Sequence, residues 1–223
     1  KALQMSVGRI RDPGDFNYPH LVFDIDAIAL AAYRLAGRAI GRYQSTEDFL
    51  VDVAVRRPAL QYRIARAVGV TLGVATVFAT VLAAWYAYGR RSGALLGGLV
   101  VCVNFLHCRD SHFGTVDVPM TLFVTLSLAF AIKAARTQVR RDYLLAGLLA
   151  GLATSAKYNA GTVIVGVIVA VAPRLWRPIG PGERRPAALS LLAAGTAMIA
   201  AFAVTSPACL LHFDRVVGGL VVQ

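Results

Sequence analysis

The chain has 223 residues, of which 57% are hydrophobic, and it carries 23 lysines and arginines against 12 acidic residues, a formal net charge of +11. The basic residues stand mostly in short clusters between apolar runs, which is typical of membrane proteins. A nucleic-acid-binding protein would instead concentrate this charge on one solvated face, so we expect no nucleic acid partner.

The first third of the chain is mixed in character. Residues 18–41 are apolar enough to suggest a membrane span, but each aspartate or arginine among them would cost about 2.5 to 3.5 kcal/mol at the centre of a span. We therefore predict a helix on the membrane surface, where Arg34, Arg38 and Arg42 form a basic ridge against lipid phosphates.

Two helix-start signals follow this segment. Ser45 and Asp48 have the spacing of a capping box, and Pro58 suits the first turn of the next helix. The chain then divides into two parts: residues 1–62 form an extracytoplasmic first-loop region with juxtamembrane helices, and residues 63–223 form a transmembrane bundle. We predict an all-α fold, a polytopic transmembrane helix bundle with short surface helices on this loop.

Six apolar segments follow, near residues 67–88, 93–107, 118–135, 143–156, 158–173 and 187–204. The first has no charged residue over a length that matches the ~20 residues needed to cross a bilayer, and a soluble core helix is rarely apolar all round for so long. Every second connection is basic ("GRRSG", "RTQVRRD" and "RLWRPIGPGERRP"), so the positive-inside rule places these three in the cytoplasm.

Residues 143–173 are also compatible with one long helix. That helix would put two of the basic connections on opposite sides of the membrane, so we predict a hairpin bent near "KYN", residues 157–159. The chain starts without methionine and stops in an apolar run. We therefore expect a piece of a longer protein that lacks spans at both ends.

Under this topology the ionisable groups collect at the end of the bundle opposite the basic connections. All four histidines fall there, as do most of the acids. Such clustering at one mouth of an apolar bundle indicates a functional site. The predicted lining residues are Asp15, Tyr18, His20, Asp110, His112, Tyr158 and His212.

Asp117 and Lys157 are the main candidates within this group. Asp117 begins a span, where partial desolvation favours action as a general base, but before Val118 and Pro119 it could equally be a helix cap. Lys157 interrupts two apolar runs, so it either extends its ammonium group to the interface or neutralises a phosphate.

Metal binding is a further alternative for the same end of the bundle. A divalent ion held by His112 with Asp110 or Asp117 is compatible with the residue types, although lone interfacial histidines are more often only hydrogen-bonded. The three cysteines have no metal-type spacing and are expected to be small buried apolar residues.

Four segments in this order, "FNYPHLVF", "SHFGTVDVPMTLFVTLSLAFA", "AGLLAGLATSAKYNAG" and "SPACLLHFD", resemble the C-type superfamily of polytopic glycosyltransferases. The resemblance is to the family 39-like group of protein O-mannosyltransferases and lipid A aminoarabinose transferases. It implies a polyprenyl-phosphate-linked sugar donor and transfer to a protein, lipid or glycan on the extracytoplasmic side. We expect an integral protein of a bacterial or archaeal plasma membrane.

The resemblance also implies roles for individual residues. Asp117 matches the acidic position of the second outer loop, and Lys157 matches a basic position that would bind the donor phosphate with Arg34 and Arg38. Tyr18 lies in the "YP" step of the first loop, but Asn17 stands where some members have a lysine. The family's principal catalytic acid would precede Lys1. A transporter or flippase-like protein and a noncatalytic homologue remain the alternatives.

Overall fold

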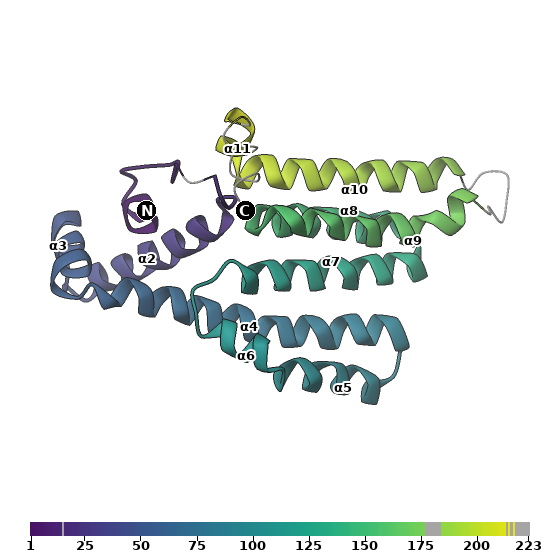
Figure 1. Ribbon diagram of the computed structural model, residues 1–223, viewed down its shortest axis with the longest axis horizontal. Helices are drawn as coiled ribbons and strands as arrows, with labels where there is room; N and C mark the ends of the chain where they lie inside the picture. The colour runs from purple at the N-terminus through teal and green to yellow at the C-terminus, as the bar shows by residue number, and fades with distance from the viewer. Residues whose placement is uncertain (15, 177–183, 213, 215, 217–223) are drawn as a thin grey trace.

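The computed structural model describes residues 1–14, 16–176, 184–212, 214 and 216. Every regular element of these residues is helical, which confirms the predicted all-α class (Figure 1). The elements are α1 (Ala2–Ser6), α2 (Leu21–Ala39), α3 (Thr46–Val51), η1 (Asp52–Arg56), α4 (Ala59–Tyr88), α5 (Arg91–Cys102), α6 (Phe105–Ser111), α7 (Asp117–Thr137), α8 (Arg140–Ala156), η2 (Tyr158–Val163), α9 (Ile164–Trp176), α10 (Arg184–Thr205) and α11 (Pro207–Leu211).

Each of the six predicted spans coincides with a helix or a pair of helices. Four helical segments are long and apolar enough to cross a membrane: α4, α7, η2 continued by α9, and α10. The α5 and α6 helices qualify together as a fifth, bent by 61° at their junction. The remaining segment is α8, which packs between α7 and α10 and buries nine of its 17 residues. The chain is therefore an integral membrane protein.

The predicted hairpin is confirmed. The α8 helix ends at Ala156, and Lys157 takes an extended conformation with φ −154° and ψ 128°. The chain then reverses through η2 into α9, so that the Tyr143 hydroxyl near the start of α8 lies 3.5 Å from the Ala170 carbonyl oxygen in the middle of α9. A single long helix would hold these two residues far apart.

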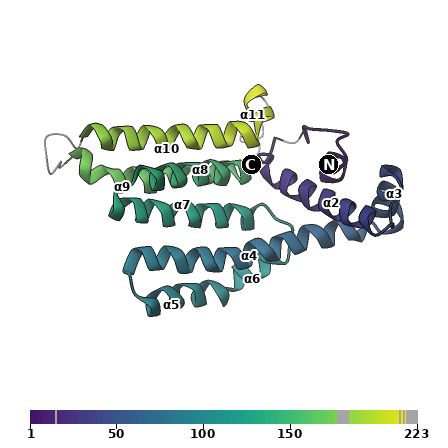
Figure 2. The same ribbon diagram turned by 180° about the vertical axis from the view of Figure 1, so that it is seen from behind.

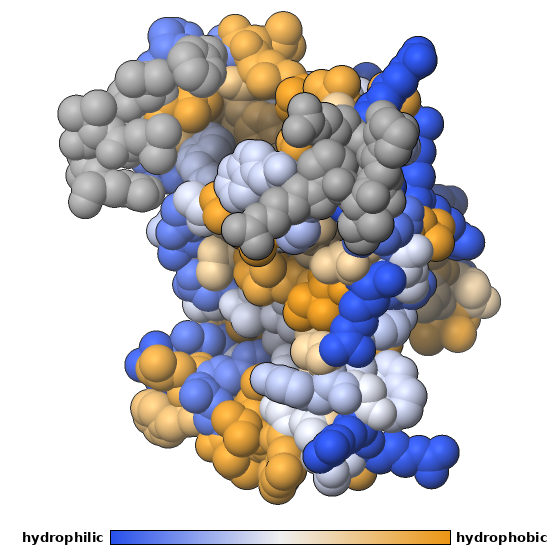
Figure 3. All heavy atoms as spheres, turned by 90° about the vertical axis from the view of Figure 1, so that its right-hand side faces the viewer, coloured by the Kyte–Doolittle hydropathy of each residue, from blue (hydrophilic) through white to orange (hydrophobic). Residues whose placement is uncertain are grey.

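The basic connections lie together at one end of the bundle. The α4–α5 and α7–α8 turns, the end of α9 and the start of α10 all lie at the right-hand side of Figure 1. Figure 3 looks onto this end, where hydrophilic side chains surround apolar ones. The alternation of charge along the sequence therefore predicted correctly which connections share an end.

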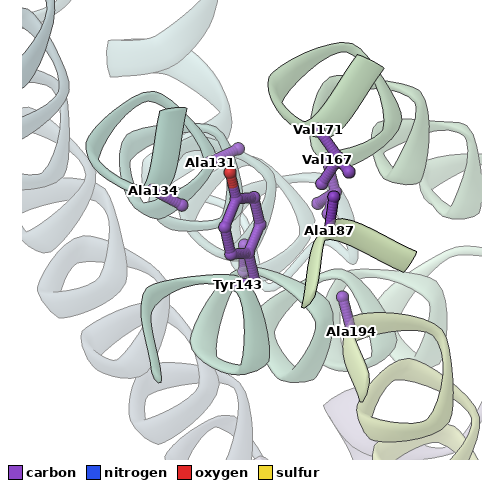
Figure 4. Close-up of a cluster of buried hydrophobic side chains, with 8 residues drawn as sticks. Ala131, Ala134, Tyr143, Val167, Val171, Ala187 and Ala194 are labelled. Atoms are coloured by element: carbon purple, nitrogen blue, oxygen red, sulfur yellow. The ribbon is translucent and has the colours of Figure 1, made fainter. Parts of the chain in front are cut away.

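The core of the bundle is built from small residues. Tyr143 is fully buried, and in Figure 4 its ring points between Ala131 and Ala134 of α7. Valines of α9 and alanines of α10 complete this cluster. The Ser127 hydroxyl donates a hydrogen bond to the Ala146 carbonyl oxygen at 2.8 Å and links α7 to α8. Small side chains let membrane helices approach closely, which these contacts require.

The N-terminal region packs beside the bundle rather than within it. The first part of α4 projects beyond the other spans, and α2 packs along it with α1 and α3 beside α2 and η1 (Figure 2). Phe49 and Val53 are fully buried there, and the predicted capping box of Ser45 and Asp48 is present. The expected boundary between residues 62 and 63 falls inside α4, which is one continuous helix.

Two details of the sequence analysis are corrected. The α2 helix ends at Ala39, so Arg42 lies beyond it and approaches Asp52 at 3.8 Å instead of extending the basic ridge. Cys209 is buried as expected, but Cys102 and Cys108 are exposed. Both belong to the bent α5–α6 pair, whose apolar surface faces outward.

An ionic cluster joins the α2–α3 connection to η1 just before α4 begins, and it makes the stability of the protein pH-dependent. Arg57 donates from Nε to the Asp52 carboxylate at 2.8 Å, and the Tyr43 hydroxyl donates to the same group at 2.7 Å. The hydrogen bond from Arg57 is the main reason that the pKa of Asp52 is lowered to about 2, against roughly 3.9 in an unfolded chain.

We predict that Asp52→Asn lowers the melting temperature at neutral pH and that the difference from wild type shrinks in acid. Because the folded-state pKa is depressed, the carboxylate stabilises the fold above about pH 4, and this contribution is lost as the pH falls toward about 2. Glu47→Gln, which removes only an exposed ion pair with Arg9, is the control and should change little. A loss that is equal in acid and at neutral pH would contradict this account.

Candidate active site

Asp117 and Lys157 meet at the end of the bundle opposite the basic connections. Lys157 Nζ lies 2.8 Å from Asp117 Oδ1, although the residues are 40 positions apart in the sequence. Asp117 is the first residue of α7 and Lys157 directly follows α8, so the antiparallel packing of these helices brings them together. Their side chains are 43% and 29% exposed, which leaves the pair accessible to a ligand.

The local geometry favours a paired carboxylate over a helix cap at Asp117. Val116 is the cap residue of α7, and no side chain makes a capping hydrogen bond there. The carboxylate is directed to Lys157 instead. Its hydrogen bond raises the pKa of Lys157 above the usual value, and the nearby Tyr18 adds to this effect. Lys157 is therefore a cation at neutral pH.

The first loop lies against the same end of the bundle. The His20 backbone N–H donates to the hydroxyl oxygen of Ser206 at 3.2 Å, and Ser206 directly follows α10. The Tyr158 hydroxyl donates to the Phe16 carbonyl oxygen at 3.3 Å. These contacts join residues 16–20 to the ends of α8 and α10, which places Tyr18 beside Lys157. The predicted loop residues Tyr18 and His20 and the helix-end residue Tyr158 are thus brought together.

Two histidines complete this contact. His20 is only 3% exposed, its ring packs on Phe16 with centroids 5.8 Å apart, and its Nε2 lies 3.8 Å from Asp12 Oδ1. His212 packs edge-on against Phe16, with ring centroids 5.7 Å apart. Both imidazoles therefore pack on Phe16 and hold the first loop in place.

Other predicted site residues lie elsewhere. Asp110 pairs with Arg109 at 2.8 Å, and His112 Nδ1 lies 2.7 Å from the Cys108 carbonyl oxygen, so both side chains bond within α6 and its C-terminal cap. Asp15 lies outside the described residues. The structure brings neither Asp110 nor His112 into contact with the Asp117–Lys157 pair.

The arginines of α2 also lie apart from this pair. Arg34 follows His20 by fourteen residues, about 21 Å along a helix axis. Its Nη1 donates to the Thr46 hydroxyl oxygen at 3.3 Å and so links α2 to α3, while Arg38 is exposed. The structure does not gather these arginines and Lys157 around one phosphate.

The described residues contain no cluster suited to a divalent ion. No group of three or more histidine, cysteine, aspartate or glutamate side chains converges in those parts of the chain. Asp117 is paired with a lysine rather than with His112. Among the described residues, His112, Asp110 and Asp117 therefore do not converge as a set of metal ligands.

A half-buried acid was missed by the sequence analysis. Asp26 lines a cleft of about 460 Å³ between α2, the start of α4 and the α6–α7 connection, with Arg66 and Tyr62 opposite it. Burial raises the pKa of Asp26 to about 6. The signal was present in the spacing, because Asp26 lies four residues from Leu30, on the buried stripe of the α2 helix.

The apolar helices that are long enough to span a membrane place the chain in the class of polytopic membrane proteins, and the accessible lysine–carboxylate pair lies at one end of the bundle. Comparison with known families identifies it further. The model of the dolichyl-phosphate-mannose-protein mannosyltransferase family matches residues 28–206, and the chain belongs to this family. It is thus of a membrane glycosyltransferase family that uses lipid-linked sugar donors. No curated protein and no solved structure matches it.

Proposed function

We propose that the protein transfers a sugar from a polyprenyl-phosphate donor to an acceptor at the Asp117–Lys157 end of the bundle. The 2.8 Å contact between these two side chains is the observation that carries this proposal. Both residues lie within the matched range, and both are accessible. A lipid phosphate must be met at the membrane surface by a cation, and Lys157 supplies one there.

The two side chains have complementary roles in the transfer. The bond between the anomeric carbon of the sugar and the phosphate oxygen breaks, and its electron pair stays on the phosphate. The ammonium group of Lys157 stabilises this developing charge. The acceptor's nucleophilic oxygen forms the new bond to the anomeric carbon, and its proton passes to the carboxylate of Asp117. Tyr18, which lies beside Lys157, borders the sugar.

Transfer takes place on the extracytoplasmic side of a bacterial or archaeal plasma membrane. The positive-inside rule supports this orientation, because the three basic connections share the end opposite the site. The acceptor, whether protein, lipid or glycan, therefore approaches from outside. The family description names mannose, which makes polyprenyl-phosphate mannose the first donor to test.

The test follows transfer from this donor by the full-length gene product in liposomes. We expect Asp117→Asn to lower kcat by about 10² to 10⁴-fold, the usual range for a general base, with a smaller change in donor KM. Glu47→Gln, on the exposed surface of α3, is the control and should turn over as wild type does. Full activity of Asp117→Asn would remove its proposed role. Solute flux without any sugar transfer would favour a transporter instead.

A further inference from the structure

Two of the three cysteines lie close together at the bend of the α5–α6 pair. The Cys108 thiol donates a hydrogen bond to the Cys102 carbonyl oxygen, with 3.0 Å between the sulfur and the oxygen. Cys102 is the last residue of α5, and Cys108 lies in α6. Both are exposed, whereas Cys209 is buried. The first two are therefore open to reagents that the third does not meet.

The break between the two helices brings these cysteines together. Asn104 lies in the break and caps α6, because its side chain accepts a hydrogen bond from the His107 backbone N–H at 3.0 Å. The Cys108 N–H donates to the Asn104 carbonyl oxygen at 2.9 Å, so the first turn of α6 carries Cys108 back to the end of α5. His107 Nε2 lies 3.0 Å from the Gly73 carbonyl oxygen and holds this turn against α4.

This geometry suits a covalent bond between the two sulfurs. A disulfide joins residues whose Cα atoms are about 4.4 to 6.8 Å apart. The Cys108 sulfur touches the carbonyl oxygen of Cys102 and so lies beside the Cα atom that carries the other thiol. The exposed Cys102 side chain is free to turn about its Cα–Cβ bond. Closure therefore requires the rotation of a side chain and no change in how the helices pack.

The cysteine pair lies at the same end of the bundle as Asp117 and Lys157. The α5 helix begins at the basic α4–α5 turn and runs toward the opposite end, where α6 follows it (Figure 1). Cys108 is followed by Arg109, whose side chain is 50% exposed, and this charge indicates contact with water rather than hydrocarbon. In the proposed orientation this end faces the outside of the cell, where disulfides form and persist.

We propose that Cys102 and Cys108 form an intramolecular disulfide that fixes the bend between α5 and α6. The thiolate of one cysteine attacks the disulfide of an extracytoplasmic thiol oxidant and displaces one of its sulfurs as a thiolate. The second cysteine then attacks the mixed disulfide and releases the other sulfur. Two electrons and two protons pass from the cysteines to the oxidant, which is reduced to two thiols. The inference rests on the extracytoplasmic placement of this end and not on sugar transfer itself.

The disulfide would strengthen a span that is bent by 61°. In the reduced protein the two cysteines are joined by a hydrogen bond from a thiol, which is a weak donor. Oxidation replaces this contact by a covalent bond. The closed loop is short, so we expect only a modest rise in melting temperature. Because α6 leads through a short connection to Asp117, the bond also restricts the segment that precedes the candidate site.

Peptide mapping of the full-length gene product tests for the bond. Cells are lysed in N-ethylmaleimide, which caps free thiols, and the protein is purified, capped again after denaturation and digested with trypsin. Trypsin cleaves after Arg91 and Arg109, so both cysteines fall in one peptide, residues 92–109, and Cys209 falls in another. We expect the 92–109 peptide to carry no cap until dithiothreitol reduces it, and then to take up a cap on each cysteine. Cys209 should be capped without reduction.

Cys108→Ser is the matched variant. Its hydroxyl can still donate to the Cys102 carbonyl oxygen, but it cannot form a disulfide. Cys102 should then be capped without reduction, and dithiothreitol should lower the melting temperature of wild type but not that of the variant. A cap on both cysteines of unreduced wild type, or a bond from Cys102 to a second chain, would overturn the inference.

Oxidation of the purified, reduced protein by glutathione disulfide separates the geometry from the placement of this end. A bond that forms in the purified protein but is absent from the protein in cells would mean that the pair faces the reducing cytoplasm, and the inference would fail together with the proposed orientation. Glutathione that stays attached to Cys102 or Cys108 would mean that the sulfurs do not reach each other, and the inference alone would fail. Neither result depends on whether Asp117→Asn lowers sugar transfer.

Discussion

Lys157→Gln is expected to lower kcat/KM for the lipid-linked donor by about 10² to 10³-fold, the cost usually found when one charge-stabilising donor is removed from an active site. Glutamine keeps most of the side-chain volume and can still donate a hydrogen bond to Asp117, but it has no charge to offer the departing phosphate. Lys157→Arg should recover part of the loss, since the guanidinium keeps the charge in a different shape. Transfer by liposome-embedded protein, with donor KM and kcat measured separately, checks both.

A second lysine–aspartate pair distinguishes a catalytic from a structural role. Lys133 of α7 and Asp142 of α8 lie 2.9 Å apart at the basic end of the same two helices. Asp142 is only 5% exposed at its side chain, so Lys133→Gln should lower the melting temperature because it weakens the pairing of a buried carboxylate. It should leave kcat/KM nearly unchanged. Lys157, whose partner Asp117 is 43% exposed at its side chain, should show the reverse pattern.

The proposed role of Lys157 would be contradicted if Lys133→Gln and Lys157→Gln each lost activity in proportion to their loss of stability. The double variant Asp117→Asn with Lys157→Gln sharpens the comparison. If the two residues act in one transfer step, kcat/KM of the double variant should be little lower than that of the less active single variant. Independent, multiplying losses would mean that the residues act in separate steps.

That Asp117 and Lys157 share one end of the bundle could be foreseen from the sequence, because it depends on helix ends. The turns of an apolar bundle alternate between its two ends, so the clustering of arginines in every second turn was enough to place both residues at the opposite end. The bend at Lys157 followed from the same alternation. Hydropathy likewise located every helix of the bundle, since an apolar segment in a membrane must satisfy its backbone hydrogen bonds internally.

What the sequence did not predict depends on contacts between distant elements. The ridge of Arg34, Arg38 and Arg42 assumed a continuous helix, but α2 ends at Ala39 and Tyr43 turns into the first-loop core. The cleft around Asp26 exists only because the projecting part of α4 lies beside α2. The central position of α8 was also hidden, because hydropathy does not show which apolar segment lies between α7 and α10.

Substitution of a glycine in α8 is expected to have a large effect on the stability of the protein. Gly147→Ala is expected to lower the free energy of unfolding by about 1 to 3 kcal/mol, the usual cost of adding a methyl group to a filled core. A Cβ at Gly147 would overlap the Ala194 carbonyl oxygen of α10, and a backbone atom cannot turn aside as a side chain can. The α8 and α10 helices would have to separate, which close packing in membranes does not tolerate.

Gly195→Ala is the control for this change, because it adds the same methyl group to α10 one residue from Ala194, in open space. Its melting temperature in detergent should equal or exceed that of wild type, while that of Gly147→Ala falls. Moving α8 away from α10 should also displace residues of the candidate site. Lys157 directly follows α8, and Ser206, which accepts a hydrogen bond from the His20 backbone at 3.2 Å, directly follows α10. We therefore expect Gly147→Ala to raise donor KM as well. Equal stability of the two variants would mean that α8 and α10 pack less closely than the structure has them.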